Sequence, residues 1–422
     1  MKLKIVSICS FFIILIFLFS GCFEKKAEVS KPAGQNVNIM FATDIHYLSH
    51  KLDEEGSILM DVITGSDGKM VQYSPEITEA LALEAIKEKP DALIVGGDLT
   101  LNGEKQSHEE LAALLRKVKN AGVPVLVVPG NHDINQPDSY RFTKEGVENV
   151  ANISEADFWN LYGPLGAYDA ISKDKDSLSY VYELNKDLWV MMLDTCRYKS
   201  GSVRDDGIIE TSTIKWMEEN LIKAQESGAH VVTVMHHNLL PHTNFSAGFT
   251  IVDYLAVINL LERYDVMVNL SGHMHVQDIA YGGDEGIYDI ATNAISVYPN
   301  YYGKILIDKE RLFTYEAEKI DVETIPSFEQ KSREFFAEST AIKIERTLDK
   351  YDISDDEKQI MIKFAEDVNI ALFSGNLNGL STEDEGYLLW QKNCPEEHFF
   401  SYLTNMLSNI KDSTYLKVNL FN

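Results

Sequence analysis

Short apolar runs alternate with amphipathic stretches of helical period along residues 37–320. Six runs rich in Val, Ile and Leu are predicted as strands, at 37–42, 92–95, 125–128, 188–193, 231–235 and 266–270. Four stretches between them repeat apolar side chains at helical spacing, at 74–89, 104–121, 211–227 and 251–263. Two later runs, 304–307 and 312–320, are predicted to pair as a hairpin. This alternation is typical of a layered α/β domain.

Two segments interrupt the alternation, and a different pattern replaces it near the C-terminus. Residues 47–73 and 134–178 are polar and rich in turn-forming residues, so we expect loops that border a site at the strand ends. Beyond residue 324 only helical periods occur, at 328–349, 355–373, 383–392 and 396–411. The predicted organisation is therefore an α/β domain over 37–323 followed by a small all-helical domain over 324–422. For the second domain we consider three roles: capping the cleft, mediating dimerisation, or bracing the sheet.

The first 22 residues have the pattern of a targeting segment. Two lysines precede an apolar run over 5–19, which leads into Ser20-Gly21-Cys22. This junction resembles a bacterial lipobox, in which the cysteine is acylated, so we expect Cys22 to carry a lipid anchor and residues 23–36 to form a flexible tether. The expected location is extracytoplasmic, with the lipid holding the chain to the cell membrane. The alternatives are a cleaved signal peptide or an uncleaved anchor.

Charge and cysteine content restrict the possible partners. The chain has 65 acidic and 38 basic residues and a formal net charge of −27, which disfavours binding to a nucleic acid polymer. A small anionic substrate is still compatible, because metal charge dominates inside one pocket. In the folded body, Cys196 and Cys394 form either one disulfide or two free thiols.

Polar clusters stand at or just past the ends of five apolar runs. They are Asp44-Ile45-His46, Gly97-Asp98, Gly130-Asn131-His132-Asp133, His236-His237 and Gly272-His273-Met274-His275. Ligand sites in open α/β sheets lie outside the carboxyl ends of the strands, so these clusters are predicted to converge. Their donors are oxygen and nitrogen only, which suits Mn, Fe or Zn. Seven groups are too many for one ion, and two ions about 3.5–4 Å apart that share a carboxylate would activate water for attack on phosphorus.

In this order the clusters resemble the calcineurin-like metallophosphoesterase superfamily, whose pattern runs DxH, GD, GNH(D/E), H and GHxH. The resemblance covers roughly residues 37–320 and implies a two-sheet sandwich flanked by helices. It implies that the first of two divalent or mixed-valence ions is held by Asp44, His46, Asp98 and His275. It implies that the second ion is held by Asp98, Asn131, His236 and His273.

The same resemblance implies roles for the residues around the ions. A hydroxide that bridges the ions would attack phosphorus in line, and His132 would protonate the leaving oxygen as general acid. Asp133 would orient the His132 imidazole. His237 either contacts the substrate or faces the other side of its strand end.

Missing motifs narrow the reaction. The stretch Gly97–Gly103 reads GDLTLNG, without the arginine of the protein Ser/Thr phosphatases and without the tyrosine that purple acid phosphatases have where Leu101 stands. It resembles the cyclic-nucleotide phosphodiesterase branch, which includes bacterial lipoproteins with a helical C-terminal domain. We therefore expect phosphodiester hydrolysis, with 3′,5′-cyclic nucleotides among the candidate substrates. Asn102 and His237 are candidate substrate contacts.

Two other functions are compatible with the same residues. The chain could instead be an extracytoplasmic phosphomonoesterase or nucleotidase, or a metal-binding surface lipoprotein without turnover. His132 argues against the pure binder, which has no use for an acid beside the ions.

The tyrosines in 298–302 either stack on a base or pack against the helical domain.

Overall fold

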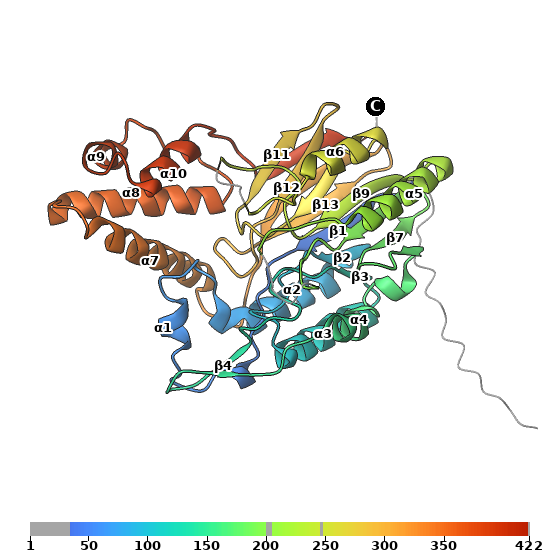
Figure 1. Cartoon of the computed structure of the whole chain (residues 1–422), viewed down its shortest axis with the longest axis horizontal. Coiled ribbons are helices and arrows are strands. Elements are labelled where there is room, and N and C mark those ends of the chain that lie inside the picture. Colours follow the sequence, from blue (N-terminus) through green and yellow to red (C-terminus); the bar gives the residue numbers. More distant parts are fainter. Residues whose placement is uncertain (1–33, 200–204, 245–247, 421–422) are drawn as a thin grey trace, which may run out of the picture.

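Two mixed β-sheets lie face to face in the computed structural model, which describes residues 34–199, 205–244 and 248–420 (Figure 1). The six-stranded sheet has the order β15-β14-β13-β1-β2-β3, and the seven-stranded sheet has the order β11-β12-β10-β9-β8-β7-β6. The strands of the first are β1 (Val37–Ala42), β2 (Ala92–Val95), β3 (Val125–Val127), β13 (Tyr301–Ile307), β14 (Leu312–Lys319) and β15 (Tyr415–Asn419). Those of the second are β6 (Ser172–Lys173), β7 (Tyr180–Asn185), β8 (Leu188–Leu193), β9 (His230–Met235), β10 (Val268–Ser271), β11 (Asp278–Gly282) and β12 (Ile287–Ala291).

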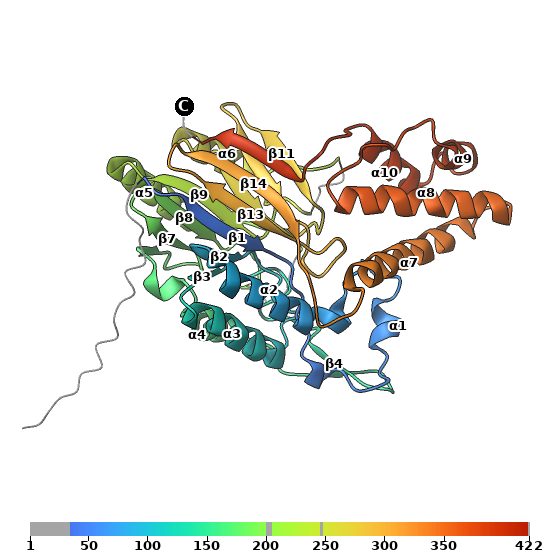
Figure 2. The same ribbon diagram turned by 180° about the vertical axis from the view of Figure 1, so that it is seen from behind.

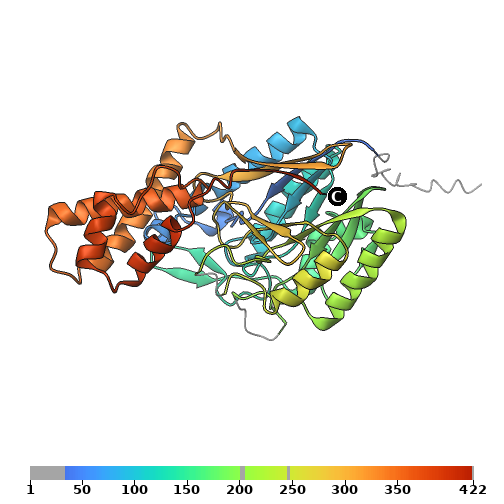
Figure 3. The same ribbon diagram turned by 90° about the horizontal axis from the view of Figure 1, so that it is seen from above.

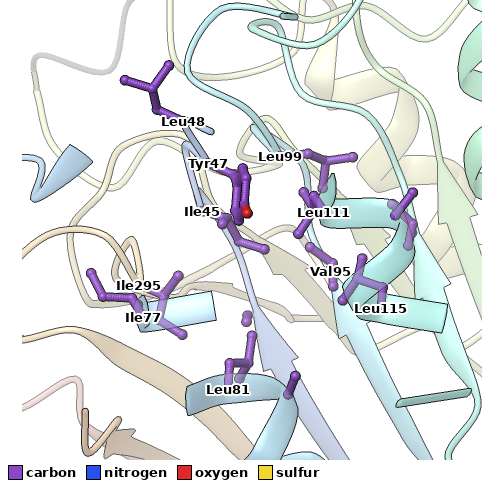
Figure 4. Close-up of a cluster of buried hydrophobic side chains, with 14 of the residues drawn as sticks. Ile45, Tyr47, Leu48, Ile77, Leu81, Val95, Leu99, Leu111, Leu115 and Ile295 are labelled. Atoms are coloured by element: carbon purple, nitrogen blue, oxygen red, sulfur yellow. The ribbon is translucent and has the colours of Figure 1, made fainter. Parts of the chain in front are cut away.

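Helices cover the outer faces of both sheets (Figure 3). The helices of this part are α1 (Leu59–Ile63), α2 (Ser74–Glu88), α3 (Lys105–Asn120), α4 (Glu155–Tyr162), α5 (Thr211–Ser227) and α6 (Tyr254–Arg263). Figure 4 shows Leu81 of α2 and Leu111 of α3 in one buried cluster with Val95 of β2. The α5 and α6 helices pack in the same way on the other sheet.

The two sheets share a core on their inner faces. Phe41 of β1, Val190 of β8 and Val234 of β9 are fully buried in the same hydrophobic cluster. Burying an apolar side chain of this size stabilises the fold by roughly 1.5–3 kcal/mol, so many such residues hold the sheets rigidly together. The predicted two-sheet sandwich flanked by helices is confirmed.

The C-terminal helices lie at one end of the sandwich (Figures 1 and 2). They are α7 (Phe328–Leu348), α8 (Asp355–Phe373), α9 (Glu385–Asn393) and α10 (His398–Leu407). They bury a core of their own, in which the indole of Trp390 donates a hydrogen bond to the Met361 carbonyl over 3.0 Å. The Ser354 hydroxyl accepts from the Glu357 amide and caps the start of α8.

Several local predictions need correction. The helical region is confirmed, but the chain continues into β15, which pairs antiparallel with β14. The segments predicted as loops contain short elements: α1 and the 3₁₀ turns His50–Leu52 and Val71–Tyr73 in one, and α4, η3 (Ala167–Asp169) and the pair β4 (Tyr140–Phe142) and β5 (Val147–Asn149) in the other. All of these elements except α4 span three to five residues, which is too short to show a period, and α4 spans only eight. Cys196 and Cys394 are free thiols.

Two features bear on the membrane. In the described ranges, none of the helices combines the length and the apolar composition that crossing a bilayer requires. The predicted lipid attachment at Cys22 and nearly all of the tether lie outside the described residues.

A buried ionic network joins the sandwich to the chain after α10. The two ring nitrogens of His242 lie 2.8 Å from Asp278 and 3.2 Å from Asp289. Lys411 pairs with Asp278 over 2.8 Å. Asp289 also accepts from the amides of Leu239 and Leu240, which follow the candidate ligand His236. The network therefore fixes the loop after His236 and ties it to the C-terminal region.

This network makes stability pH-dependent. Burial opposes the charged form of His242, but its two carboxylate partners outweigh burial and raise the pKa of His242 to about 9. Because an unfolded histidine has a pKa of about 6.5, the contribution is complete below about pH 6.5 and is lost as pH rises through 9. We expect His242 to contribute a fall of roughly 2–3 kcal/mol to the free energy of unfolding, measured with urea, between pH 7 and pH 10. The His242→Gln variant should lose this fall, and an unchanged fall would contradict the assignment.

Candidate dinuclear metal site

The polar side chains predicted as ligands meet where the carboxyl ends of five strands come together. Asp44 and His46 follow β1, Asp98 follows β2, and Asn131 follows β3. From the other sheet, His236 follows β9, and the pair His273 and His275 follows β10. Donor atoms of Asp44, His46, Asp98 and His275 lie within 4.8 Å of one another, and so do those of Asp98, His236 and His273. The two groups share Asp98.

The first group has the spacing of a coordination sphere. The Nε2 atoms of His46 and His275 are 3.1 Å apart. His275 Nε2 lies 3.3 Å from Asp44 Oδ1, and His46 Nε2 lies 3.6 Å from Asp98 Oδ2. Ligands bound at about 2.0–2.2 Å in a tetrahedron are themselves about 3.3–3.6 Å apart, which is close to these separations, so the four side chains are placed to hold one ion.

The second group brings lone pairs together in the same way. His236 Nδ1 donates to the Gly96 carbonyl over 3.0 Å, which leaves a lone pair on Nε2. That Nε2 faces Asn131 Oδ1 at 3.0 Å and Asp98 Oδ1 at 3.4 Å, which are both acceptors. In the described part of the chain, His273 Nε2 is buried without a hydrogen-bond partner. An arrangement of acceptors without donors fits a cation, and O and N donors suit Mn, Fe or Zn.

The electrostatics of the pocket make Asp98 an anion. Burial alone would raise its pKa, but the imidazoles of His236 and His132 outweigh burial and hold the pKa of Asp98 well below its usual range. Burial likewise opposes a charge on His236, but Asp98 outweighs it and raises the pKa of His236 to about 9, so a proton competes with a metal ion for the Nε2 lone pair. The shared carboxylate is therefore ionised and available to bind two ions at once.

The backbone at the ligands is strained. Five of them have φ angles in the left-handed region: Asp44 at 53°, His46 at 48°, Asp98 at 46°, His273 at 68° and His275 at 62°. Each non-glycine residue in that region costs on the order of 1 kcal/mol, and such strain gathers at functional sites. These turns direct the side chains back across the strand ends toward one another.

Two glycines allow the loops to approach closely. A Cβ on Gly130 would overlap the Asp98 amide nitrogen, and a Cβ on Gly272 would overlap the Asp44 carboxylate. Asp44 accepts from the His273 amide at 3.0 Å and from the Thr43 hydroxyl at 2.7 Å. The carboxylates of both groups are thus positioned by backbone that has no room for another side chain.

His132 stands at the edge of the first group, and its partner differs from the prediction. Its ring centroid is 5.3 Å from that of His46. Its Nδ1 donates to Asn102 Oδ1 over 2.7 Å, and its amide donates to Asp98 Oδ1 over 2.9 Å. Asn102, predicted as a substrate contact, is therefore the residue that orients the imidazole.

Asp133 does not have its predicted contact with His132. Its carboxylate accepts from the amides of Leu99, Thr100 and Gly130 at 2.7–3.1 Å. It therefore holds the loops after β2 and β3 together. The sequence motif GNHD places Asp133 beside His132 in the chain, but the turn directs the two side chains apart.

For His237 and Tyr298, the sequence left open whether the side chain contacts the substrate or packs within the protein. His237 is buried, with Nδ1 2.7 Å from the Thr195 hydroxyl and Nε2 3.0 Å from the Asp205 carbonyl. Both ring nitrogens are thus engaged by protein groups, and the ring packs 4.5 Å from that of His273, which favours a supporting role for His237 over a substrate contact. Tyr298 is buried against Phe336 of α7, which favours its packing role.

Two residues near the site were missed by the sequence analysis, which predicted only that the surrounding segment borders the site. Asp67 Oδ2 lies 3.7 Å from His275 Nδ1, and Lys69 Nζ lies 3.0 Å from the same carboxylate. A single Asp-Gly-Lys in a loop has no period and follows no strand, so no pattern marks it.

Comparisons with known proteins agree with this geometry. Residues 37–277 match the family model for the calcineurin-like phosphoesterase, and residues 296–413 match the C-terminal domain of cyclic nucleotide phosphodiesterase. A probable cyclic nucleotide phosphodiesterase of Ruthia magnifica subsp. Calyptogena magnifica is 23% identical over 49% of this chain and 73% of that protein. The glycerophosphodiester phosphodiesterase GpdQ of Enterobacter lignolyticus is 24% identical over 46% of this chain and 59% of that protein. The fold resembles a dimetal phosphatase from Danio rerio, with a TM-score of 0.51 and 13% identity over 68% of this chain and 96% of that one.

We expect Gly130→Ala to lower metal content, because its Cβ would displace the shared ligand Asp98. Elemental analysis of the purified protein should show two ions per chain in the wild type and at most one in the variant. Gly228→Ala is the matched control, since Gly228 has a φ of 73° but no atom within 4 Å of the added Cβ. Two ions in the Gly130→Ala protein would contradict the shared role of Asp98.

Proposed function

The chain belongs to the calcineurin-like phosphoesterase family, and from that premise we propose that it hydrolyses phosphodiesters with two metal ions, 3′,5′-cyclic nucleotides being the candidate substrates. The observation that carries the proposal is the pair of ligand groups joined by Asp98, with the His132 imidazole beside them. The preference for diesters is supported by the C-terminal match to cyclic nucleotide phosphodiesterase and by the names of the two relatives. It is also supported by GDLTLNG, which has no arginine to hold the second charge of a monoester.

In this proposal one ion is held by Asp44, His46, Asp98 and His275, and the other by Asp98, Asn131, His236 and His273. Bound ions of this kind neutralise phosphoryl charge and lower the pKa of the attacking water. The O and N donors would suit Mn, Fe or Zn. The protein contributes the fixed spacing of the donors, which the strained turns after the strands maintain.

His132 supplies the proton for the leaving oxygen. Its Nδ1 donates to Asn102 Oδ1. The other ring nitrogen, Nε2, is therefore the one left to protonate the leaving oxygen. Burial lowers the pKa of His132, with the charge of Asp98 opposing. Because Nδ1 holds the proton donated to Asn102, Nε2 carries a proton only in the imidazolium, which a lowered pKa makes a stronger acid and a smaller fraction at neutral pH. Asn102 acts through His132 as a positioning residue.

We also propose that the protein acts outside the cytoplasm, attached to the membrane by a lipid on Cys22. The proposal is supported by the apolar run over 5–19 and the Gly21-Cys22 junction. A small phosphate ester outside the cell is consistent with a net charge of −27, which disfavours polymeric nucleic acid as a substrate.

Substrate preference tests the function directly. We expect the Mn-loaded soluble fragment beginning at Val37 to hydrolyse an aryl phosphodiester with a kcat/KM at least about tenfold above that of the matching monoester, a difference of about 1.4 kcal/mol in transition-state binding. A 3′,5′-cyclic nucleotide is assayed in parallel. Preference for the monoester would replace this proposal by the phosphomonoesterase alternative. Absence of turnover in protein that carries two ions per chain would favour the metal-binding lipoprotein.

Replacing His132 separates catalysis from metal binding. His132→Ala should lower kcat by roughly 10²–10⁴-fold, because the leaving oxygen loses its proton donor. The loss should be larger for a diester with an alkyl leaving group than for one with a nitrophenolate, which needs no proton. Metal content, read by elemental analysis, should stay at two ions. The exposed His50→Ala is the control, and an equal loss for both leaving groups would contradict the role as acid.

A further inference from the structure

The segment between α1 and the 3₁₀ turn Val71–Tyr73 is attached to the strand end that carries Asp44. Lys69 forms an antiparallel bridge with Val297. The Met70 amide donates to the Ser296 carbonyl over 2.7 Å, and the Ser296 hydroxyl donates to the Asp44 carbonyl over 2.8 Å. Residues 64–70 are therefore fixed relative to the first ligand group.

Helix α7 packs on the other side of this segment. A Cβ on Gly65 would lie 2.9 Å from Ile342 Cγ2, and one on Gly68 would lie 2.5 Å from Phe336 Cδ2. Both glycines have left-handed φ angles, 75° and 80°. The segment thus lies between the metal-ligand turns and the C-terminal helices, with its backbone against α7.

Lys69 places a positive charge beside the first ligand group. Its side chain is only 13% exposed, and its ammonium pairs with Asp67, whose carboxylate reaches His275. An ammonium has three donors, and Asp67 accepts from one.

We propose that the Lys69 ammonium binds a non-bridging oxygen of the phosphate ester at the first ligand group, and that α7 serves the site by holding residues 64–70 in place. This inference rests on the proposed function, because it names a substrate contact of that site. Asp67 cancels the charge of Lys69, so the pair adds donors without adding net charge. Such a contact suits a phosphodiester, which carries a single negative charge.

The test uses inorganic phosphate as the probe of anion binding. Phosphate binding to Mn-loaded protein is measured by isothermal titration calorimetry, alongside the KM and kcat for the aryl diester. A hydrogen bond between charged groups is typically worth one to two powers of ten in affinity, so Lys69→Met should raise the Kd for phosphate and the KM by roughly 10–100-fold. Lys69→Arg should restore most of the binding. Metal content should remain at two ions in each variant.

Lys51→Met is the matched control. Lys51 lies in the same polar segment and is also ion-paired, with Glu110 at 2.8 Å, but its side chain is 70% exposed. It should leave the Kd for phosphate unchanged within about twofold. A Lys69→Met protein that binds phosphate as tightly as the Lys51→Met protein would overturn the proposal.

A double-mutant cycle tests the part played by α7. Ile342→Ala removes the side chain that touches Gly65 and should weaken phosphate binding about threefold or more, whereas the exposed Leu388→Ala should not. In the Lys69→Met background the effect of Ile342→Ala should vanish, because α7 acts through Lys69. An equal effect in both backgrounds would overturn this role.

The binding measurement separates this inference from the proposed function. If the wild type hydrolyses no diester but Lys69→Met still weakens phosphate binding, Lys69 is an anion contact and the phosphodiesterase proposal alone fails. If the wild type turns over the diester and Lys69→Met changes neither KM nor phosphate affinity, the Lys69 proposal alone fails.

Discussion

The mutual repulsion of buried carboxylates and imidazole lone pairs is the constraint on which the rest of this site depends. Asp44 and Asp98 are almost wholly excluded from solvent, and their neighbours are further acceptors. Ionised groups removed from water are strongly destabilising unless they are paired. Hydrogen bonds from the His273 amide to Asp44 and from the His132 amide to Asp98 stabilise these carboxylates in part. The imidazoles of His236 and His132 add further compensation at Asp98, and the two ions that we propose would supply the rest.

Holding these donors together requires backbone that ordinary strands do not adopt. Both carboxylates lie in left-handed turns, and Gly130 and Gly272 allow neighbouring loops to approach without side-chain overlap. Such conformations persist only where the surroundings are rigid. The rigidity comes from the core between the sheets, which includes Phe41 of β1 and fixes the strand ends within the sandwich. The fold and the site are therefore coupled through the first residues after each strand, where core packing ends and strain begins.

The parts of this architecture that the sequence predicted are those with a repeating or ordered pattern. The apolar runs before Asp44, Asp98 and His236 predicted buried strands, and the position of the clusters past the strand ends predicted their convergence. Asp133 was misassigned because adjacency in the chain does not determine the direction of side chains across a turn. Lys69 was missed because it reaches the site from a loop, through tertiary packing alone. β15 was missed for a related reason, since its partner β14 lies about a hundred residues earlier in the chain.

Three separate attachments decide among the roles considered for the C-terminal helices. Helix α7 packs on the segment that carries Lys69, Lys411 binds Asp278 in the network with His242, and β15 pairs with β14 in the six-stranded sheet. A mobile cap needs few attachments, because each buried contact must break when the cap opens. The C-terminal region is instead held at α7, at Lys411 and at β15. Attachments at these three places are suited to transmit the rigidity of the sandwich to the loops near the metal ligands. The described contacts therefore favour the bracing role.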